Sequence, residues 1–168
     1  MIQTTLTIDL KLPDSAKVWV YQANRKLTVD EKQMAHQQLS TFVQSWQSHG
    51  QALKADFTIL YDYFIILGVD ESMHGASGCS IDSSVKVIKE IEQSLGLTLL
   101  DKSQIAYTLS KEEVQIHTMD FRDVKRAILS SDIKKDTYIF NNQVTTFKEL
   151  KASWLVEASQ SWLGRFFS

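Results

Sequence analysis

The chain has 168 residues, of which 43% are hydrophobic and 23% are charged, proportions that are ordinary for one globular domain spanning residues 1–168. Its formal net charge of −2, without a long basic run, excludes a dedicated nucleic-acid-binding protein. A single cysteine excludes an internal disulfide, and no apolar stretch approaches the roughly 20 residues that span a bilayer. Residues 1–11 lack the basic start and apolar core of a signal peptide, so we expect a cytoplasmic protein with no membrane or nucleic-acid partner.

The first third of the chain predicts a strand followed by a helix. Residues 17–22, Lys-Val-Trp-Val-Tyr-Gln, are rich in β-branched and aromatic types and predict the first clear strand. Thr28 and Glu31 have the spacing of a capping box, which starts a helix that we place over 28–49, with Gly50 at its end. Apolar residues recur at helical spacing along one stripe of this helix: Ala35, Leu39, Phe42, Val43 and Trp46.

A hairpin and a second helix come next. Two apolar runs, 57–60 and 63–69, are joined near Asp62, and so short a connection makes them antiparallel neighbours. A loop over 75–82 separates them from a helix near 81–95, which Gly96 ends. The residues expected to face inward recur at helical spacing: Ile81, Val85, Ile88, Ile91 and Leu95.

The last third of the chain predicts shorter elements. Residues 105–109 and 114–118 have the pattern of a hairpin, and 120–129 that of a short helix. A strand over 137–140 is followed by the turn-forming pair Asn141-Asn142. Thr146 and Glu149 have the spacing of a second capping box, which opens a C-terminal helical region with a break before Gly164.

This order of elements favours an α+β fold. Strands outnumber helices and several are joined by hairpin-length turns, so we expect helices packed on a largely antiparallel sheet in a single domain. The residues expected in the core are Val18, Val20, Leu39, Phe42, Trp46, Ile65, Leu67, Val85, Ile88 and Leu95.

The loop Gly75-Ala-Ser-Gly-Cys-Ser-Ile-Asp82 is the strongest candidate for a functional site. It lies between an apolar strand and a helix, and its two glycines let backbone N–H groups converge beside the positive end of the helix dipole. Gly75, Ser77, Gly78 and Ser80 would hold a small anionic ligand through amides and hydroxyls, with Arg25 or Lys26 as a helper from another loop. The alternative is that the glycines only make the turn and that Ser80 or Asp82 caps the helix, which needs no ligand.

The only cysteine, Cys79, is the candidate nucleophile. A helix N-terminus favours the thiolate, and His74 is near enough in sequence to act as a base in acyl-transfer or thiol chemistry. Neighbouring carboxylates either orient that histidine or oppose the thiolate by repulsion: Asp70, Glu71 and Asp82. We favour the alternative, in which Cys79 is a small buried residue at a tight strand–helix junction and the protein is a non-catalytic binding module.

Metal and cofactor binding have little support in the sequence. Asp70, Glu71 and His74 are clustered, but His36 and His49 fall on opposite margins of the first helix's apolar stripe. There is no HExxH motif and no Cys/His pairing, so we expect solvated surface groups rather than a metal site, and no cofactor.

The C-terminal aromatic residues suggest either a core-facing helix or a partner surface. On one helix they would share a broad face: Trp154, Leu155, Ala158, Trp162 and Phe166, with Phe167 adding apolar area. We favour docking of this face onto the sheet. The alternative is an exposed patch for a protein partner or a homodimer through Trp154, Trp162, Arg165 and Phe166.

Several segments together resemble a small family of uncharacterised Bacteroidetes proteins, whose members often carry the label "ABC transporter ATPase". The resemblance lies in Val18-Trp-Val-Tyr-Gln-Ala-Asn-Arg25, the 75–82 loop, Phe140-Asn-Asn142, Ser161-Trp162 and Arg165-Phe166, and it covers nearly the whole chain. It implies no established activity and no known catalytic residues.

The ATPase label does not fit this sequence. Such an enzyme needs a Gly-x-x-x-x-Gly-Lys-Ser/Thr loop, whose lysine reaches the phosphates and whose hydroxyl binds magnesium. Here Gly75 is followed three residues later by Gly78, and the next lysine is Lys86. Because the Walker A motif is absent, we reject an ABC ATPase.

Overall fold

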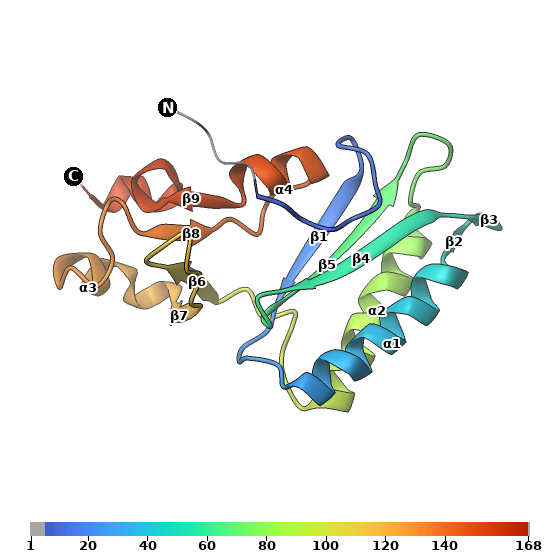
Figure 1. Cartoon of the computed structure of the whole chain (residues 1–168), viewed down its shortest axis with the longest axis horizontal. Helices are drawn as coiled ribbons and strands as arrows, with labels where there is room; N and C mark the ends of the chain where they lie inside the picture. Colours follow the sequence, from blue (N-terminus) through green and yellow to red (C-terminus); the bar gives the residue numbers. More distant parts are fainter. Residues whose placement is uncertain (1–5, 168) are drawn as a thin grey trace.

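The computed structural model describes residues 6–167, which form two neighbouring lobes (Figure 1). Residues 1–5, part of the segment without signal-peptide character, lie outside this range. One lobe has a three-stranded sheet with two long helices, and the other has a four-stranded sheet with shorter helices. The strand pairs of both sheets are antiparallel, which confirms the α+β class. None of the helices in residues 6–167 has the length and apolar character needed to cross a membrane.

The first sheet has the strand order β1-β5-β4, with β1 at Lys17–Gln22, β4 at Lys54–Leu60 and β5 at Phe64–Asp70. The β4–β5 hairpin confirms the predicted antiparallel pair, and its turn places Tyr61 and Asp62 at positive φ. Every residue of β5 is buried because β5 lies between two strands and is covered on both faces. Its apolar run therefore reflects a central strand.

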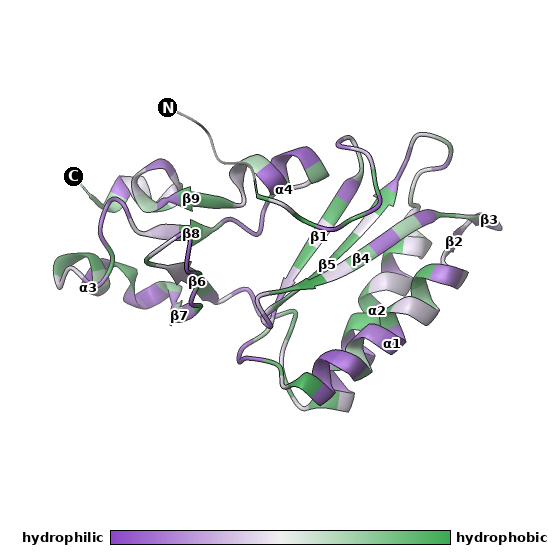
Figure 2. Ribbon diagram, in the orientation of Figure 1, coloured by the Kyte–Doolittle hydropathy of each residue, from purple (hydrophilic) through white to green (hydrophobic). Residues whose placement is uncertain are grey.

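Helices α1 (Val29–Ser45) and α2 (Gly78–Leu95) cover one face of this sheet (Figure 1). Their apolar sides meet Ile65 and Leu67 of β5 in a shared core, together with Leu39 and Ile88. Figure 2 shows the corresponding contrast, with β5 mostly hydrophobic and α1 carrying many hydrophilic residues. The predicted capping box of α1 is present, since Thr28 accepts from Glu31 N–H and Glu31 reaches back to Thr28 N–H.

The first helix is shorter than its sequence pattern predicts. It ends at Ser45, and the chain turns into a small hairpin of β2 (Gln47–Ser48) and β3 (Gln51–Ala52). His49 and Gly50 occupy its turn with φ of 52° and 76°, so Gly50 reverses the chain in a hairpin and does not end a helix. Trp46 remains buried, as predicted, but from an extended position after the helix.

The inward face of α2 is rotated relative to the prediction. Ile88, Ile91 and Leu95 are buried as expected, but Val85 is only half-buried and Val87 takes its place. The small residues Ser80 and Ser84 continue the buried stripe towards the N-terminus, where an apolar pattern does not reveal it. Val20 and Phe42, also expected inside, are likewise half-buried.

The second sheet has the order β7-β6-β8-β9, with β6 at Gln104–Thr108, β7 at His117–Asp120, β8 at Tyr138–Phe140 and β9 at Leu155–Glu157. Beside it lie the α-helix α3 (Val124–Leu129) and the 3₁₀ turns η1 (Phe121–Asp123), η2 (Ala158–Gln160) and η3 (Trp162–Phe166). Helix α4 (Phe147–Ser153) instead packs against β1, on the face of the first sheet opposite α1 and α2. The predicted 105–118 hairpin is present, but its second strand begins at His117 after a longer connection.

The C-terminal region is not one helix. Thr146 caps α4 by accepting from Glu149 N–H, as predicted, but Glu149 bonds to the N–H of Thr145 and not to that of Thr146. The chain then passes through strand β9 before two 3₁₀ turns. The expected single aromatic face is therefore wrong, because a strand pairing with β8 interrupts it.

An aromatic core joins the two lobes. Phe64 of β5, Phe140 of β8 and Trp154 pack edge to face or tilted, with ring centres 4.8–4.9 Å apart. Trp154 Nε1 donates to Asn142 Oδ1 at 2.9 Å, and Asn142 Nδ2 donates to Gln22 Oε1 at 2.9 Å. Apolar contact and a satisfied polar chain thus fix β1 against the second sheet.

Candidate functional site

The glycine loop forms a self-capped helix start. Ser77 is the N-cap of α2, and its hydroxyl accepts from Ser80 N–H at 3.2 Å. Ser80 Oγ in turn accepts from Ser77 N–H at 2.6 Å, so the two serines complete a reciprocal capping box. The helix begins at Gly78, three residues before the predicted start. This arrangement satisfies two of the loop's amides internally, as in the reading that needs no ligand.

Cys79 is exposed at the first turn of α2, not buried at the junction as we expected. Its exposure leaves the thiol open to reagents. His74 is exposed in the preceding loop, and no hydrogen bond joins its side chain to Cys79 within the described part of the chain. Asp70 is engaged elsewhere: it accepts from Ser72 N–H at 2.9 Å and lies 3.7 Å from Lys54 Nζ. The Ser72 hydrogen bond is the main cause of the lowered pKa of Asp70.

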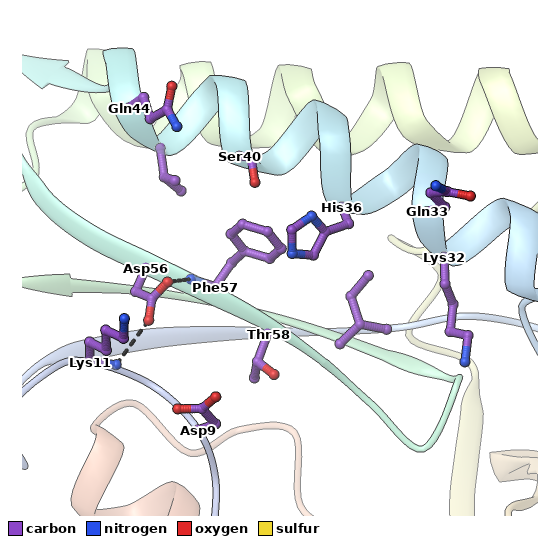
Figure 3. Close-up of a pocket in the computed structure, with 12 residues that line it drawn as sticks. Asp9, Lys11, Lys32, Gln33, His36, Ser40, Gln44, Asp56, Phe57 and Thr58 are labelled. Atoms are coloured by element: carbon purple, nitrogen blue, oxygen red, sulfur yellow. Dashed lines mark hydrogen bonds between the residues drawn. The ribbon is translucent and has the colours of Figure 1, made fainter.

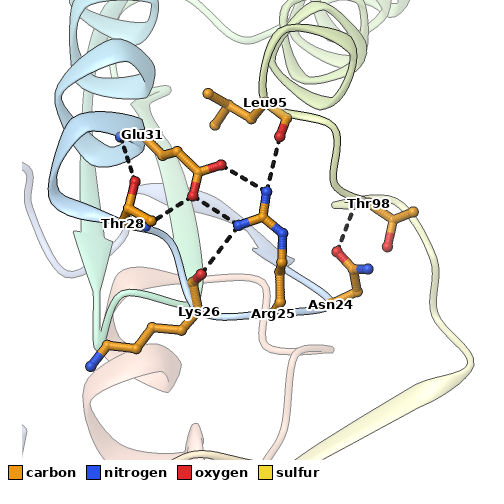
Figure 4. A network of polar contacts seen from close by, with 7 residues as sticks. All are labelled: Asn24, Arg25, Lys26, Thr28, Glu31, Leu95 and Thr98. Carbon is orange, nitrogen blue, oxygen red and sulfur yellow. Dashed lines mark hydrogen bonds and ion pairs between the residues drawn. The ribbon is translucent and has the colours of Figure 1, made fainter.

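Arg25 does not lie near the glycine loop. Its guanidinium forms two hydrogen bonds to Glu31, at 2.7 and 2.8 Å, and a third to the carbonyl of Leu95 at 2.9 Å (Figure 4). Leu95 is the last residue of α2 and the glycine loop is at its first turn. An 18-residue helix separates these ends by about 27 Å, so Arg25 cannot serve a ligand in the loop.

The Arg25 network has a structural role. A cation at the C-terminus of α2 interacts favourably with the helix dipole, and Glu31 also accepts from Thr28 N–H at the start of α1. The network therefore ties the beginning of α1 to the end of α2 (Figure 4). The Arg25 hydrogen bond, with help from the Thr28 amide, lowers the pKa of Glu31 to about 2.

The C-terminal aromatics divide between interior and surface. Trp154 is fully buried between the lobes, so it cannot form part of an exposed patch. Trp162 is 43% exposed on η3, and the guanidinium of Arg165 lies 5.8 Å from its ring centre and 4.8 Å from that of Phe166. A surface of Trp162, Arg165 and Phe166 remains from the predicted partner patch.

Within residues 6–167 no group of three His, Cys, Asp or Glu side chains is arranged to hold a metal ion.

A surface groove of about 710 Å³ lies between α1 and β4, and we call it the β4 groove (Figure 3). This volume lies in the range of about 300–1,000 Å³ that is usual for ligand sites. Helix α1 forms one wall, β4 the floor and the segment around Asp9 and Lys11 the other wall, from these residues: Asp9, Lys11, Lys32, Gln33, His36, Ser40, Val43, Gln44, Asp56, Phe57, Thr58 and Ile59.

The side chains of β4 alternate in chemistry across the floor of the groove. Phe57 and Ile59 point towards α1, where the His36 ring meets Phe57 edge-on with centres 5.0 Å apart (Figure 3). Asp56 and Thr58 point the other way, towards Asp9 and Lys11. This alternation follows from the period of two in a β-strand. The floor therefore presents apolar side chains on its α1 side and polar ones on the other, while α1 itself lines the groove mostly with polar residues.

The floor of the groove is an unpaired sheet edge. In the described sheet, β4 has β5 as its one neighbour. Leu53 N–H donates to Trp46 O and Phe57 N–H donates to Asp56 Oδ1, both at 2.9 Å and both away from β5. Since alternate residues of an antiparallel strand point their N–H and C=O to the same side, Ala55 and Ile59 also direct theirs away from β5, towards the open edge.

The sequence predicted none of the β4 groove. Its only local signal is Ala55-Asp-Phe-Thr-Ile59, in which polar and apolar residues alternate as in a half-buried strand. That pattern does not show which strand ends at a sheet edge, because sheet order depends on contacts between distant segments.

Comparisons with family models, with curated proteins and with solved structures found no match to this chain.

Proposed function

We propose that this protein is a non-catalytic binding module that recognises another protein through the β4 groove. The observation that carries the proposal is the unpaired edge of β4 at the floor of this groove. Main-chain donors and acceptors at this edge, flanked by alternating apolar and polar side chains of β4, favour a polypeptide ligand, which offers matching groups along its length. The unpaired, exposed thiol of Cys79 fits a reducing compartment, so we place the module in the cytoplasm.

The side chains of the groove support binding rather than chemistry. Lys32 Nζ forms an ion pair with Asp62 at 2.6 Å, and the two oxygens of Asp56 accept from the backbone amides of Lys11 and Phe57. These charged groups already have structural partners. His36 lies against Phe57, an arrangement that offers an aromatic surface to a ligand.

Selection of a phage-displayed library of random peptides on the immobilised full-length chain tests this proposal. Ser40 lies on the groove side of α1, so Ser40→Trp should fill the groove and abolish binding of the enriched peptides. Gln37 lies on the other side of α1, in a second hollow of about 680 Å³ between α1 and α2, so Gln37→Trp should leave binding unchanged. Absence of any peptide that distinguishes the two variants would contradict the proposal.

The alternative function is cysteine-dependent acyl-transfer or thiol chemistry, and the exposure of Cys79 at the start of α2 is the observation in its favour. A nucleophilic thiol there should be alkylated by iodoacetamide faster than free cysteine at pH 6. His74→Ala should slow the reaction if His74 is the base. A rate equal to that of free cysteine, unchanged by His74→Ala, excludes this alternative.

A further inference from the structure

We propose that the partner of the β4 groove is an extended segment of another protein, with alternating apolar and polar side chains, which pairs with β4 as an additional strand. This inference rests on the proposed function and names its mode of binding. The open edge from Ala55 to Ile59 is about 14 Å long, enough to pair with a short strand.

The alternating side chains of β4 set the side-chain chemistry of that segment. Side chains on one face of the added strand would lie beside Phe57 and Ile59 under α1, where apolar groups gain from burial. Those on the other face would lie beside Asp56, Thr58 and Lys11, where polar groups keep hydrogen bonds. Two lysines and two aspartates line the groove, Lys11, Lys32, Asp9 and Asp56, so no strong net charge selects a highly charged ligand.

Asp56 protects this edge in the free protein. Its Oδ1 accepts from Phe57 N–H and its Oδ2 from Lys11 N–H, both at 2.9 Å (Figure 3). The carboxylate thus occupies the central amide that an added strand would use. Charged side chains at sheet edges are a known means of preventing unwanted pairing. The incoming strand must displace the Asp56 carboxylate from the Phe57 amide, so Asp56 competes with the partner for this hydrogen-bond donor.

A second copy of this chain fits the edge less well than a separate segment. Pairing two β4 edges would bring two Asp56 carboxylates into one ladder, where like charges destabilise the pair. Each copy would also bring its own α1 wall and its own residues around Lys11 to the same edge. An extended segment brings only a backbone and alternating side chains.

Pairing of the partner with β4 is tested by removing a main-chain N–H from the edge of β4 and measuring the affinity for a peptide enriched by the phage selection. Ala55→Pro removes an outward N–H while β4 stays paired with β5, since proline is tolerated at a sheet edge. We expect its affinity to fall about tenfold or more, the loss of one or two hydrogen bonds. Ala55→Ser keeps the N–H and is the matched control, with affinity within about twofold of wild type. Thermal melting verifies that both variants are folded.

Two further measurements keep the proposal falsifiable if Ala55→Pro does not fold. Two peptide series should be made, one N-methylated at the odd-numbered residues and the other at the even-numbered residues. The series whose methylated amides face β4 should lose binding, and the other should keep it. Asp56→Ala should bind the peptide several-fold more tightly than wild type, because the strand no longer competes with the carboxylate for the Phe57 amide. A purely structural Asp56 would give equal or weaker binding.

The outcomes separate the two proposals. One outcome would support the binding function but overturn strand pairing. In that outcome Ser40→Trp abolishes peptide binding, whereas Ala55→Pro and both series of N-methylated peptides leave it unchanged. Failure to enrich any groove-dependent peptide would overturn both. A wild-type dimer that Ala55→Pro dissociates would assign the edge to a second copy and overturn the separate partner.

Discussion

At the scale of single residues, two glycines differ in whether the structure has room for a side chain. A Cβ at Gly164 would lie 2.5 Å from the backbone oxygen of Ser159, whereas a Cβ at Gly78 would meet nothing within 4 Å. We expect Gly164→Ala to destabilise the fold by about 1–3 kcal/mol, because backbone must move to accept the methyl group. Gly78→Ala, in the first turn of α2, should be neutral or slightly stabilising. Urea denaturation measures both, and equal effects would contradict the assigned contact.

The ion pair of Glu31 with Arg25 should make the free energy of unfolding depend on pH. The pKa of Glu31 falls from 4.5 to about 2 in the folded state, first because Arg25 donates to it and then because the Thr28 amide does. Because the pKa of Glu31 is lower in the folded than in the unfolded state, its ionisation stabilises the folded state at pH values above the unfolded pKa. This stabilisation disappears as the pH falls towards 2. We expect Glu31→Gln to be less stable than wild type at pH 6, with the difference shrinking between pH 4.5 and 2. A difference that is constant over this range would contradict the role of the Arg25 network.

At the scale of elements, helix caps decide where α1 and α2 begin. Ser77 and Ser80 supply the reciprocal cap of α2, so Ser77→Ala should cost about 1 kcal/mol and lower the melting temperature by about 2–4 °C. Ser83→Ala is the matched control, since Ser83 is exposed within the same helix and its hydroxyl bonds to the Cys79 carbonyl. Circular dichroism melting of the two variants gives the comparison. Equal melting temperatures would mean that the cap contributes nothing.

The length of the elements also limits what each can do. Helix α1 ends at Ser45 because the chain must turn at His49 and Gly50 to enter β4, and this short turn brings Trp46 back onto the core. Trp46 Nε1 donates to the carbonyl of Ser80 at 2.8 Å, which fixes the start of α2 against the end of α1. The same hairpin pairs Leu53 with Trp46 and leaves the edge of β4 open only beyond that point.

At the scale of the whole molecule, the aromatic core between the lobes should make unfolding cooperative. Trp154 is fully buried among residues of both sheets and its indole N–H is bonded to Asn142. We expect Trp154→Ala to cost about 3–5 kcal/mol and Trp162→Ala, on the surface, less than about 0.5 kcal/mol. Hydrogen exchange of amides in both lobes measures the effect. Destabilisation confined to the second sheet would show that the lobes unfold separately and would contradict a single domain over 1–168.

The sequence by itself determined most of the local structure, because caps, helical spacing and alternation act between residues a few positions apart. Thr28 with Glu31, the hairpin around Asp62 and the left-handed cap at Gly96 all follow from such short-range rules. The candidate loop at 75–82 was also placed correctly at the start of a helix. Its exact cap could have been found as well, since Ser77 and Ser80 have capping-box spacing with serine at both ends.

Only the tertiary structure decided what those elements do together. The sequence pattern predicted that Trp154 and Trp162 share one helical face. In the structure strand β9, paired with β8, lies between them, so Trp154 is buried in the core and Trp162 is exposed at the surface. The sequence analysis also predicted Arg25 as a helper of the glycine loop. Packing of α1 against α2 instead places Arg25 at the C-terminal end of α2, away from that loop. The β4 groove depends on which strand lacks a neighbour, and that is set by long-range pairing, whose free energy is a property of the whole chain.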